Sequence, residues 1–114
     1  MNKLNMTAIA AAIGLVFSAG AMAQGLSKDA YKAADDRIAA EYATAKATCD
    51  PLSGNTKDIC IAEAKGKEKV AKAELEARNE PTAKNRYKAV VAKAEADYAV
   101  ANEKCDDKIG NDRD

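Results

Sequence analysis

The most constraining feature of this sequence is an internal correspondence at an offset of 56 residues. The segment Tyr31-Lys32-Ala33 recurs as Tyr87-Lys88-Ala89, and further matches are Tyr42 with Tyr98, Cys49-Asp50 with Cys105-Asp106, Gly54-Asn55 with Gly110-Asn111, and Asp58 with Asp114. A repeat at a fixed offset indicates that one helical unit is used twice. We expect repeat one at about 28–82 and a partial repeat two at about 84–114, because the counterpart of Cys60 would lie beyond the last residue.

The first 23 residues have the pattern of a secretory signal peptide. Lys3 supplies a positive charge, residues 8–17 are apolar, and Ala21-Met22-Ala23 places small residues at the cleavage positions. We therefore predict a signal peptide at 1–23, a helical repeat domain at 24–114, and a periplasmic location. The apolar stretch is short for a membrane span and no second one follows, so we expect no stable membrane insertion after cleavage.

The charge balance and the scarcity of large apolar residues limit the classes of protein. The whole chain has 18 basic and 18 acidic residues, and removing Lys3 with the signal leaves 18 − 1 = 17 against 18. Such a balance argues against a nucleic-acid-binding protein, which needs a basic excess. Most of the apolar residues are alanines, which bury little area, so we expect a thin core that depends on a cross-link.

Apolar residues at helical spacing predict three helices. Ser27 is a suitable N-cap for the first, at 28–49, whose stripe is Tyr31, Ala34, Ile38, Tyr42, Ala45 and Cys49. The second follows a cap at Asn55 or Thr56 and runs to about Arg78, with the stripe Ile59, Ala62, Gly66, Val70, Ala73 and Ala77. The third covers 83–105 after a cap at Thr82, with the stripe Tyr87, Val90, Ala94, Tyr98, Ala101 and Cys105.

Short connections between these helices predict antiparallel neighbours. The turn at 50–55 is rich in Pro, Ser, Gly and Asn, and Pro81 ends the second helix. The predicted fold is all-α: an antiparallel helical hairpin stapled by a disulfide, plus a third helix from a truncated second repeat, with coiled-coil-like packing. We expect the four tyrosines to anchor the core rather than to bind a ligand. Gly66 either lets the backbone of a neighbouring helix approach closely, or is a tolerated position at which glycine weakens the helix.

Two of the three cysteines lie where the first two helices meet. Cys49 ends the first helix and Cys60 begins the second, so an oxidising periplasm favours a disulfide worth roughly 3 kcal/mol. A redox-active pair is the alternative, although such pairs typically use a closer spacing. Cys105 is left unpaired, with three interpretations: an intermolecular disulfide in a homodimer, a free thiol, or a shortened form of a longer protein, which we favour.

The sequence contains no recognisable catalytic, cofactor-binding or metal-binding residues. It has no His, which excludes an imidazole base, a Ser-His or Cys-His nucleophile and a His metal site. Paired acids such as Asp35-Asp36 and the Lys/Glu run at 65–69 are typical of a solvated helix surface. We therefore expect a protein that is not an enzyme and needs no cofactor.

Three segments carry a family resemblance: residues 27–32, the Cys49…Cys60 segment with Gly54-Asn55, and residues 63–75. Together they resemble a family of exported Ala/Lys-rich helical repeat proteins of Gram-negative bacteria, sometimes labelled TolA-like or cell envelope biogenesis proteins. The resemblance implies a role in the envelope and supplies no catalytic residues. Longer members complete the second cysteine pair, whereas this sequence departs from the pattern after Cys105.

Two classes of function remain from the sequence. The first is a non-enzymatic periplasmic protein with a structural or protein-interaction role in the cell envelope, binding a protein partner there and no nucleic acid. The alternative is a small periplasmic stress chaperone, whose marginally stable helices expose their apolar stripe under stress. A small enzyme is the least favoured class, given the missing catalytic groups.

Overall fold

The protein is described by a computed structural model of residues 25–106 and 108. Its helices are α1 (Lys28–Ala47), α2 (Gly54–Asn79) and α3 (Ala83–Asp106), and the described residues contain no strand. The prediction of an all-α fold, a hairpin with a third helix, is confirmed. The predicted signal peptide at 1–23 lies outside the described residues.

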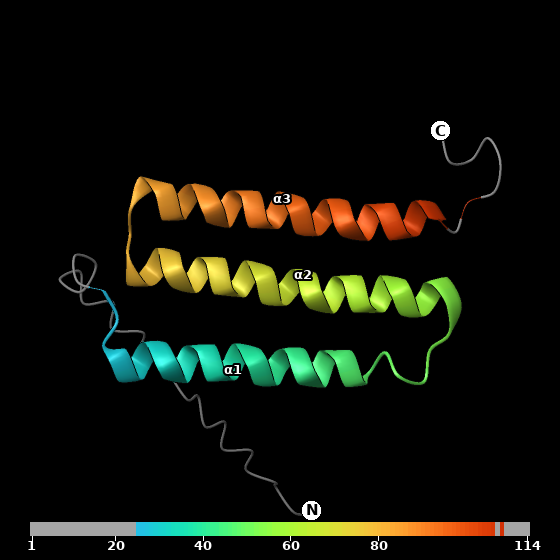
Figure 1. Cartoon of the computed structure of the whole chain (residues 1–114), viewed down its shortest axis with the longest axis horizontal. Helices are drawn as coiled ribbons and strands as arrows, with labels where there is room; N and C mark the ends of the chain where they lie inside the picture. Colours follow the sequence, from blue (N-terminus) through green and yellow to red (C-terminus); the bar gives the residue numbers. More distant parts are fainter. Residues whose placement is uncertain (1–24, 107, 109–114) are drawn as a thin grey trace, which may run out of the picture.

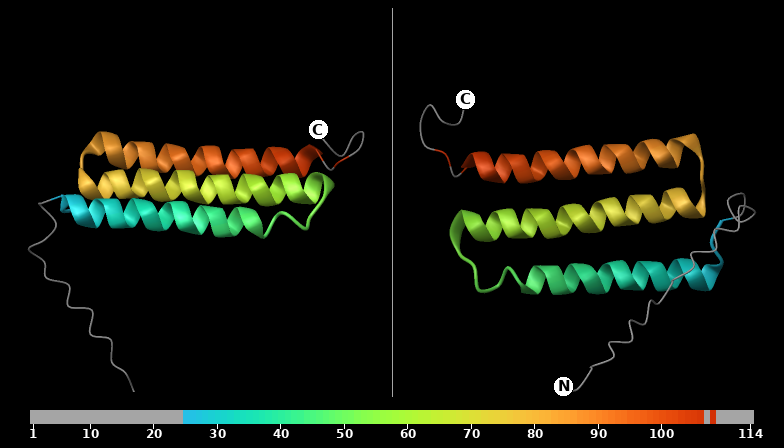
Figure 2. Two further views of the ribbon diagram at one scale, coloured as in Figure 1. Left: turned by 60° about the horizontal axis from the view of Figure 1, so that its bottom comes forward. Right: turned by 180° about the vertical axis from the view of Figure 1, so that it is seen from behind.

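The three helices lie antiparallel and side by side in a single layer, with α2 in the middle (Figure 1). The oblique view and the view from behind show the same order (Figure 2). α2 packs extensively on both neighbours, and more so on α3 than on α1. Because α1 and α3 lie on opposite sides of α2, α2 must present an apolar face to each of them.

The start of α1 agrees with the prediction, whereas the turn between α1 and α2 differs from it in detail. Ser27 caps α1 as expected, since its Oγ accepts a hydrogen bond of 3.1 Å from the backbone N–H of Ala30. α1 then ends at Ala47, two residues before the predicted Cys49, because the chain tightens into a turn before Pro51. α2 begins at Gly54, before the predicted start, and Gly54 has a φ of +60°, a conformation that glycine adopts without steric cost.

Pro81 and two local hydrogen bonds shape the turn between α2 and α3. Glu80 is extended, as a residue before Pro81 should be, and α2 ends at Asn79. The Thr82 Oγ1 accepts a 3.1 Å hydrogen bond from the backbone N–H of Asn85, which confirms Thr82 as the cap of α3. The Asn85 amide donates to the Glu80 carbonyl at 3.0 Å, so this buried side chain holds the turn closed.

α2 carries two apolar faces, whereas the sequence predicted one. The predicted stripe, which contains Gly66, faces α3, because a Cβ built on Gly66 would lie 3.0 Å from the Ala96 Cβ. The face toward α1 carries Cys60, Ala64 and Leu75, a set that the single-stripe prediction omitted. Leu75 is only 1 % exposed, which makes it the largest fully buried side chain of the described residues.

Candidate functional site

The disulfide predicted between Cys49 and Cys60 is present and fastens α1 to α2 at the turn. The two Cα atoms are 5.7 Å apart, a separation that the bond spans without backbone movement. Cys49 is fully buried, and Cys60 lies in the second turn of α2 rather than the first, because that helix begins early. The remaining cysteine, Cys105, is free and exposed near the end of α3.

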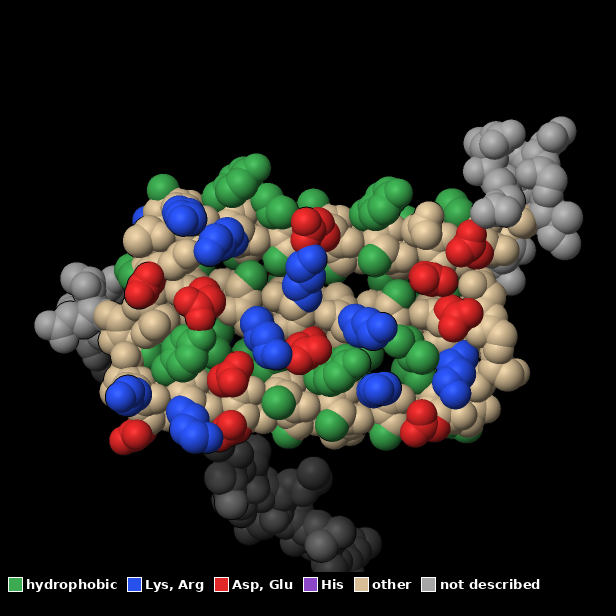
Figure 3. Space-filling model, in the orientation of Figure 1, with side chains coloured by type: hydrophobic (Ala, Val, Ile, Leu, Met, Phe, Trp, Pro, Cys, Tyr) green, Lys and Arg blue, Asp and Glu red, His purple; other side chains and the backbone are tan. Residues whose placement is uncertain are grey.

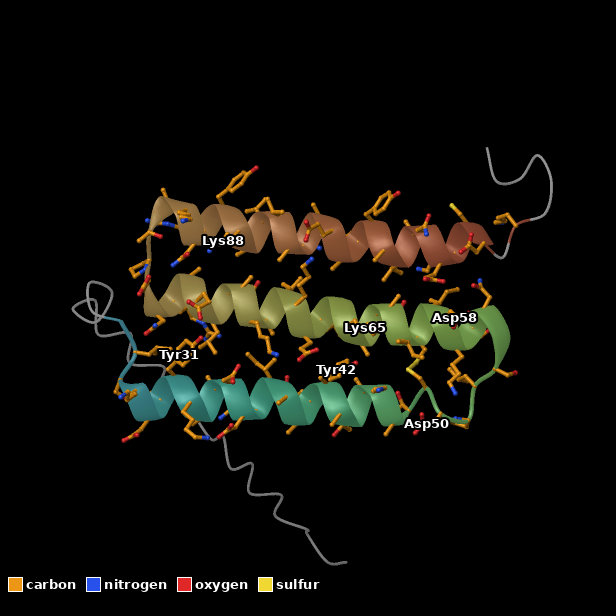
Figure 4. The ribbon with its side chains drawn as sticks, viewed as in Figure 1. Tyr31, Tyr42, Asp50, Asp58, Lys65 and Lys88 are labelled. Carbon is orange, nitrogen blue, oxygen red and sulfur yellow. A yellow bond between two sulfur atoms is a disulfide. The ribbon has the colours of Figure 1, made fainter. Side chains whose placement is uncertain are left out.

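The inner face of α1 consists of Tyr31, Ala34, Ile38, Tyr42 and Ala45, continued by Cys49 in the turn after the helix, and all six are buried or half-buried. Ile38 is 9 % exposed and Cys49 is 0 % exposed. Tyr31 and Tyr42 lie between α1 and α2 (Figure 4). The prediction that the tyrosines anchor the core is therefore confirmed for this helix.

The outer face of α3 is defined by the residues at the same offset of 56: Tyr87, Val90, Ala94, Tyr98, Ala101 and Cys105. All six are exposed, with Tyr87 and Val90 each at 69 % and Tyr98 at 73 %. Hydrophobic side chains project along the α3 edge of the layer (Figure 3). The prediction that Tyr87 and Tyr98 anchor the core is wrong: their stripe points away from α2.

The tyrosine stripe of α3 is exposed because α3 packs on α2 through a different stripe, which consists of small residues. Ala92 is 5 % exposed and Ala96 meets Gly66, so the backbones of the two helices come close together. Tyrosine at these positions would hold the helices apart, whereas alanine and glycine let them approach. Gly66 therefore allows a close approach, one of the two roles that the sequence left open.

Two asparagines fix α3 at its ends. The Asn55 amide donates a 2.9 Å hydrogen bond to the Glu103 carbonyl, which joins the start of α2 to the end of α3. Asn85 holds the opposite end, where the chain turns from α2 into α3. The sequence assigned Asn55 only to a helix cap and did not single out Asn85. The sequence signal that was available is an asparagine in an alanine row: Asn85 lies on the same helical face as Ala92 and Ala96.

Shallow grooves run along both sides of the contact between α2 and α3. The larger has a volume of about 680 Å³, and its apolar lining includes Gly66, Val70, Ala96 and Val100. The smaller, of about 440 Å³, also reaches Gly66 and Ala96, and lies on the other flank of the contact between α2 and α3. Lysines and acidic residues surround both grooves, and neither brings together the acid, base and nucleophile of a catalytic site.

Charged pairs cover the exposed helix surfaces. Lys32–Asp36, Lys72–Glu68 and Lys93–Asp97 are i,i+4 pairs at 2.7, 2.8 and 3.0 Å. Lys69 and Glu95 form a pair between α2 and α3. Exposed pairs of this kind each contribute only about 0–1 kcal/mol, so they add solubility more than stability.

One hydrogen bond links the start of α1 to the end of α2: the Tyr31 hydroxyl donates to the Glu76 carboxylate. This bond, with smaller effects from burial and from the charges of Glu76 and Asp35, raises the pKa of Tyr31 above its ordinary value. Hydrogen bonds to Asp36 and Glu68 likewise raise the pKa of Lys32 and of Lys72, respectively. The bond from Tyr31 closes the end of the hairpin that lies away from the disulfide.

Within the part of the chain that the structure describes, no cluster of three or more His, Cys, Asp or Glu residues is placed to hold a metal ion. None of the helices there has the length and apolar character to cross a membrane. The outer face of α3 is thus the feature of the described residues that most needs a functional explanation, because three large apolar side chains are exposed on one helix.

Comparison with known proteins found no matching protein-family model, no matching curated protein and no matching solved structure. The resemblance carried by the cysteine segment therefore stays a prediction.

Proposed function

We propose that this protein is a non-enzymatic structural or protein-interaction component of the cell envelope, acting in the periplasm. The observation that carries the proposal is the outer face of α3, where Tyr87, Val90 and Tyr98 are about seven-tenths exposed. Contiguous apolar side chains on a soluble surface are typical of protein interaction sites. Tyrosine in particular combines a large apolar area with a hydroxyl, which suits it to interfaces.

The disulfide supports a periplasmic location. Bonds such as Cys49–Cys60 persist in oxidising environments and are rare in the reducing cytosol. The predicted signal peptide at 1–23 gives a route to the periplasm. The family resemblance adds an envelope role, and the absence of histidine from the sequence removes the commonest general base.

A stress chaperone is the second candidate, and one observation favours it. The apolar outer face of α3 is exposed without any opening of the hairpin, so a client with exposed apolar segments has a surface to bind in the folded state. The hairpin itself is thinly packed, with Ile38, Ala64 and Leu75 among its few buried side chains. Stress that opens it would expose the inner face of α1 as well.

Site-specific photo-crosslinking in the periplasm tests the proposed role. A photoreactive amino acid replaces Tyr98 on the outer face of α3, and the matched control carries it at Ala40, an exposed position of α1. We expect discrete crosslinked products from position 98 and few from position 40. Products of equal intensity and pattern from both positions would show that the outer face has no special role.

An aggregation assay separates the two candidates. If the chaperone function is correct, the purified protein suppresses aggregation of an unrelated acid-denatured client, and the double substitution Tyr87→Ser with Tyr98→Ser weakens that protection. Crosslinks to a small number of defined products, without protection of any client, favour the structural role. Enzymatic turnover of a small-molecule substrate, if it disappears when the protein is unfolded, contradicts both candidate functions.

A further inference from the structure

The outer face of α3 repeats a face that is covered elsewhere in the same chain. On α1, the residues at the equivalent positions are buried or half-buried under α2, and Cys49 is 0 % exposed. On α3, Tyr98 is 73 % exposed and Cys105 is exposed. The sequence pattern that packs against a helix in the first instance is thus present a second time without a described helix against it.

The face is elongated, since the 24 residues of α3 span about 36 Å, and a helix of similar length matches it in shape. A second copy of the chain supplies one, since α3 presents an elongated apolar face that is free in each copy.

We propose that two copies of this protein associate through the outer faces of their α3 helices, in antiparallel orientation, to form a non-covalent homodimer. This inference rests on the proposed interaction role and names the partner for its surface. A twofold arrangement uses the same face on both copies, and each copy has one such face, so the assembly closes at two.

The antiparallel register follows from the sizes of the side chains. Ala94 lies at the middle of α3, and placing it opposite Ala94 of the second copy puts Val90 opposite Tyr98 and Tyr87 opposite Ala101. Each tyrosine then faces a smaller residue, so the helices pack at an even separation. A parallel, in-register pair would place tyrosine on tyrosine and leave a gap between the two alanines.

The charges beside the stripe agree with this register at its centre. Lys93 and Asp97 lie on one flank of the face, where both side chains are about two-thirds exposed. In the antiparallel pair, Lys93 lies across from Asp97 of the second copy, and the twofold axis repeats the contact. Towards the ends, Arg86 approaches Lys104 of the second copy. On the other flank, Glu95 lies near Glu95 of the second copy, and each is paired with Lys69 of its own chain, so the charge complementarity is confined to the flank that carries Lys93 and Asp97.

The size of the face sets the expected strength of association. A single helix face about 36 Å long buries less surface than a standard protein interface of about 1,600 Å², which places the dimer among the weaker complexes. We therefore expect a dissociation constant in the range of about 1–100 µM. Dimer formation should depend on concentration and persist in the Cys105→Ser variant, because no intermolecular disulfide is involved.

Sedimentation equilibrium of the purified Cys105→Ser variant, across this concentration range and without reductant so that the Cys49–Cys60 bond stays intact, tests the association. We expect the mass to rise from one to two copies. The double substitution Val90→Lys with Tyr98→Lys should weaken the dimer at least tenfold, whereas the control Ala40→Lys with Ala47→Lys, at exposed positions of α1, should not. A monomer at every concentration, or equal weakening by both variants, overturns the proposal.

Cysteine crosslinking tests the register. In the antiparallel pair, Cys105 faces Ala83 of the second copy, while the two Cys105 residues are about 33 Å apart. Under mild oxidation, Ala83→Cys should form a covalent dimer, and adding Cys105→Ser should abolish it. A covalent dimer of the unaltered protein through Cys105 would instead show a parallel pair and refute the antiparallel arrangement.

Photo-crosslinking and sedimentation together distinguish failure of the homodimer from failure of the interaction role. If photo-crosslinking at position 98 captures a defined envelope protein while the purified protein stays monomeric, the homodimer is refuted and the interaction role stands. If the crosslinked product is twice the mass of this chain, the homodimer is supported directly. If position 98 yields nothing above the position-40 control, both proposals are contradicted.

Discussion

Tyr42 and Tyr98 occupy the same position of the 56-residue correspondence and opposite environments: Tyr42 is half-buried between α1 and α2, while Tyr98 is 73 % exposed. The two residues are of the same type and lie on helices of similar sequence. Comparing substitutions at both positions therefore measures how much packing against α2 contributes to the free energy of unfolding. The pair also separates a residue that stabilises the fold from one that is available for binding.

We expect Tyr42→Ala to destabilise the protein by about 1–2 kcal/mol, because a half-buried aromatic ring loses part of its contact area. Tyr98→Ala should change the free energy of unfolding by no more than about 0.5 kcal/mol. Urea unfolding followed by circular dichroism, at protein concentrations where sedimentation shows only the monomer, measures both values. Equal losses would contradict the assignment of the two environments.

Reduction of the Cys49–Cys60 disulfide should lower the melting temperature strongly. A loop of this size contributes about 3 kcal/mol in the chain-entropy model, which corresponds to about 12–24 °C for a domain of this length. Thermal melts with and without reductant measure the effect. The matched control is Cys105→Ser, which should lose as much on reduction as the unaltered protein; an unchanged melting temperature after reduction would show that the hairpin does not depend on the bond.

Gly66→Leu should weaken the packing of α3 on α2 by about 1–3 kcal/mol, because even a Cβ at this position would lie 3.0 Å from that of Ala96. Ala96→Gly should cost about 1 kcal/mol through helix propensity alone. Because the second change removes the atom that the leucine meets, the double variant should be more stable than the sum of the single effects predicts. Simple additivity would show that the two residues are not in contact.

The hydrogen bond from Tyr31 to Glu76 should make stability depend on pH in the alkaline range. The folded protein holds the Tyr31 proton more tightly than the unfolded chain, whose tyrosine has the ordinary pKa of 10.0. The stabilisation is therefore fully present below pH 10.0 and is lost as the pH rises through the raised pKa of the folded state.

Urea unfolding at pH 8 to 11 compares the unaltered protein with Tyr31→Phe. We expect the unaltered protein to be more stable below about pH 10 and to lose this advantage above it. Glu76→Gln is the control, because it replaces the carboxylate that raises the pKa of Tyr31 and should reduce the pH dependence of the difference. A constant difference across this range would argue against the bond.

The sequence was sufficient to predict the three helices, the caps of α1 and α3, and the disulfide, because these depend on local signals. The cap predicted for the second helix, at Asn55 or Thr56, is wrong, because α2 begins at Gly54. The side-chain hydroxyls of Ser27 and Thr82 cap the starts of α1 and α3, and Pro81 restricts the backbone after α2. One short turn brings Cys49 and Cys60 together. Residues 1–24 lie outside the described structure, so the signal peptide stays a prediction.

The side on which α3 packs was not predictable in the same way. α3 has two faces that a helix can bury, the tyrosine stripe and the stripe that contains Ala92 and Ala96. The tyrosines offer more apolar area, which favours their burial when α3 is considered alone. The smaller stripe is used because Gly66 on α2 accepts a close neighbour, and that condition is set by the partner helix rather than by α3 itself.

The position of α2 between two neighbours has a consequence for how the protein unfolds. In a single layer each helix is held chiefly by the one next to it in the sequence, so stability resembles a chain of nearest-neighbour links rather than one shared core. α3 is held by hydrogen bonds from Asn55 and Asn85 and by close packing, and its cysteine, Cys105, forms no disulfide. Backbone amides of α3 should therefore exchange with solvent before those of the disulfide-bonded hairpin, through openings that leave α1 and α2 folded.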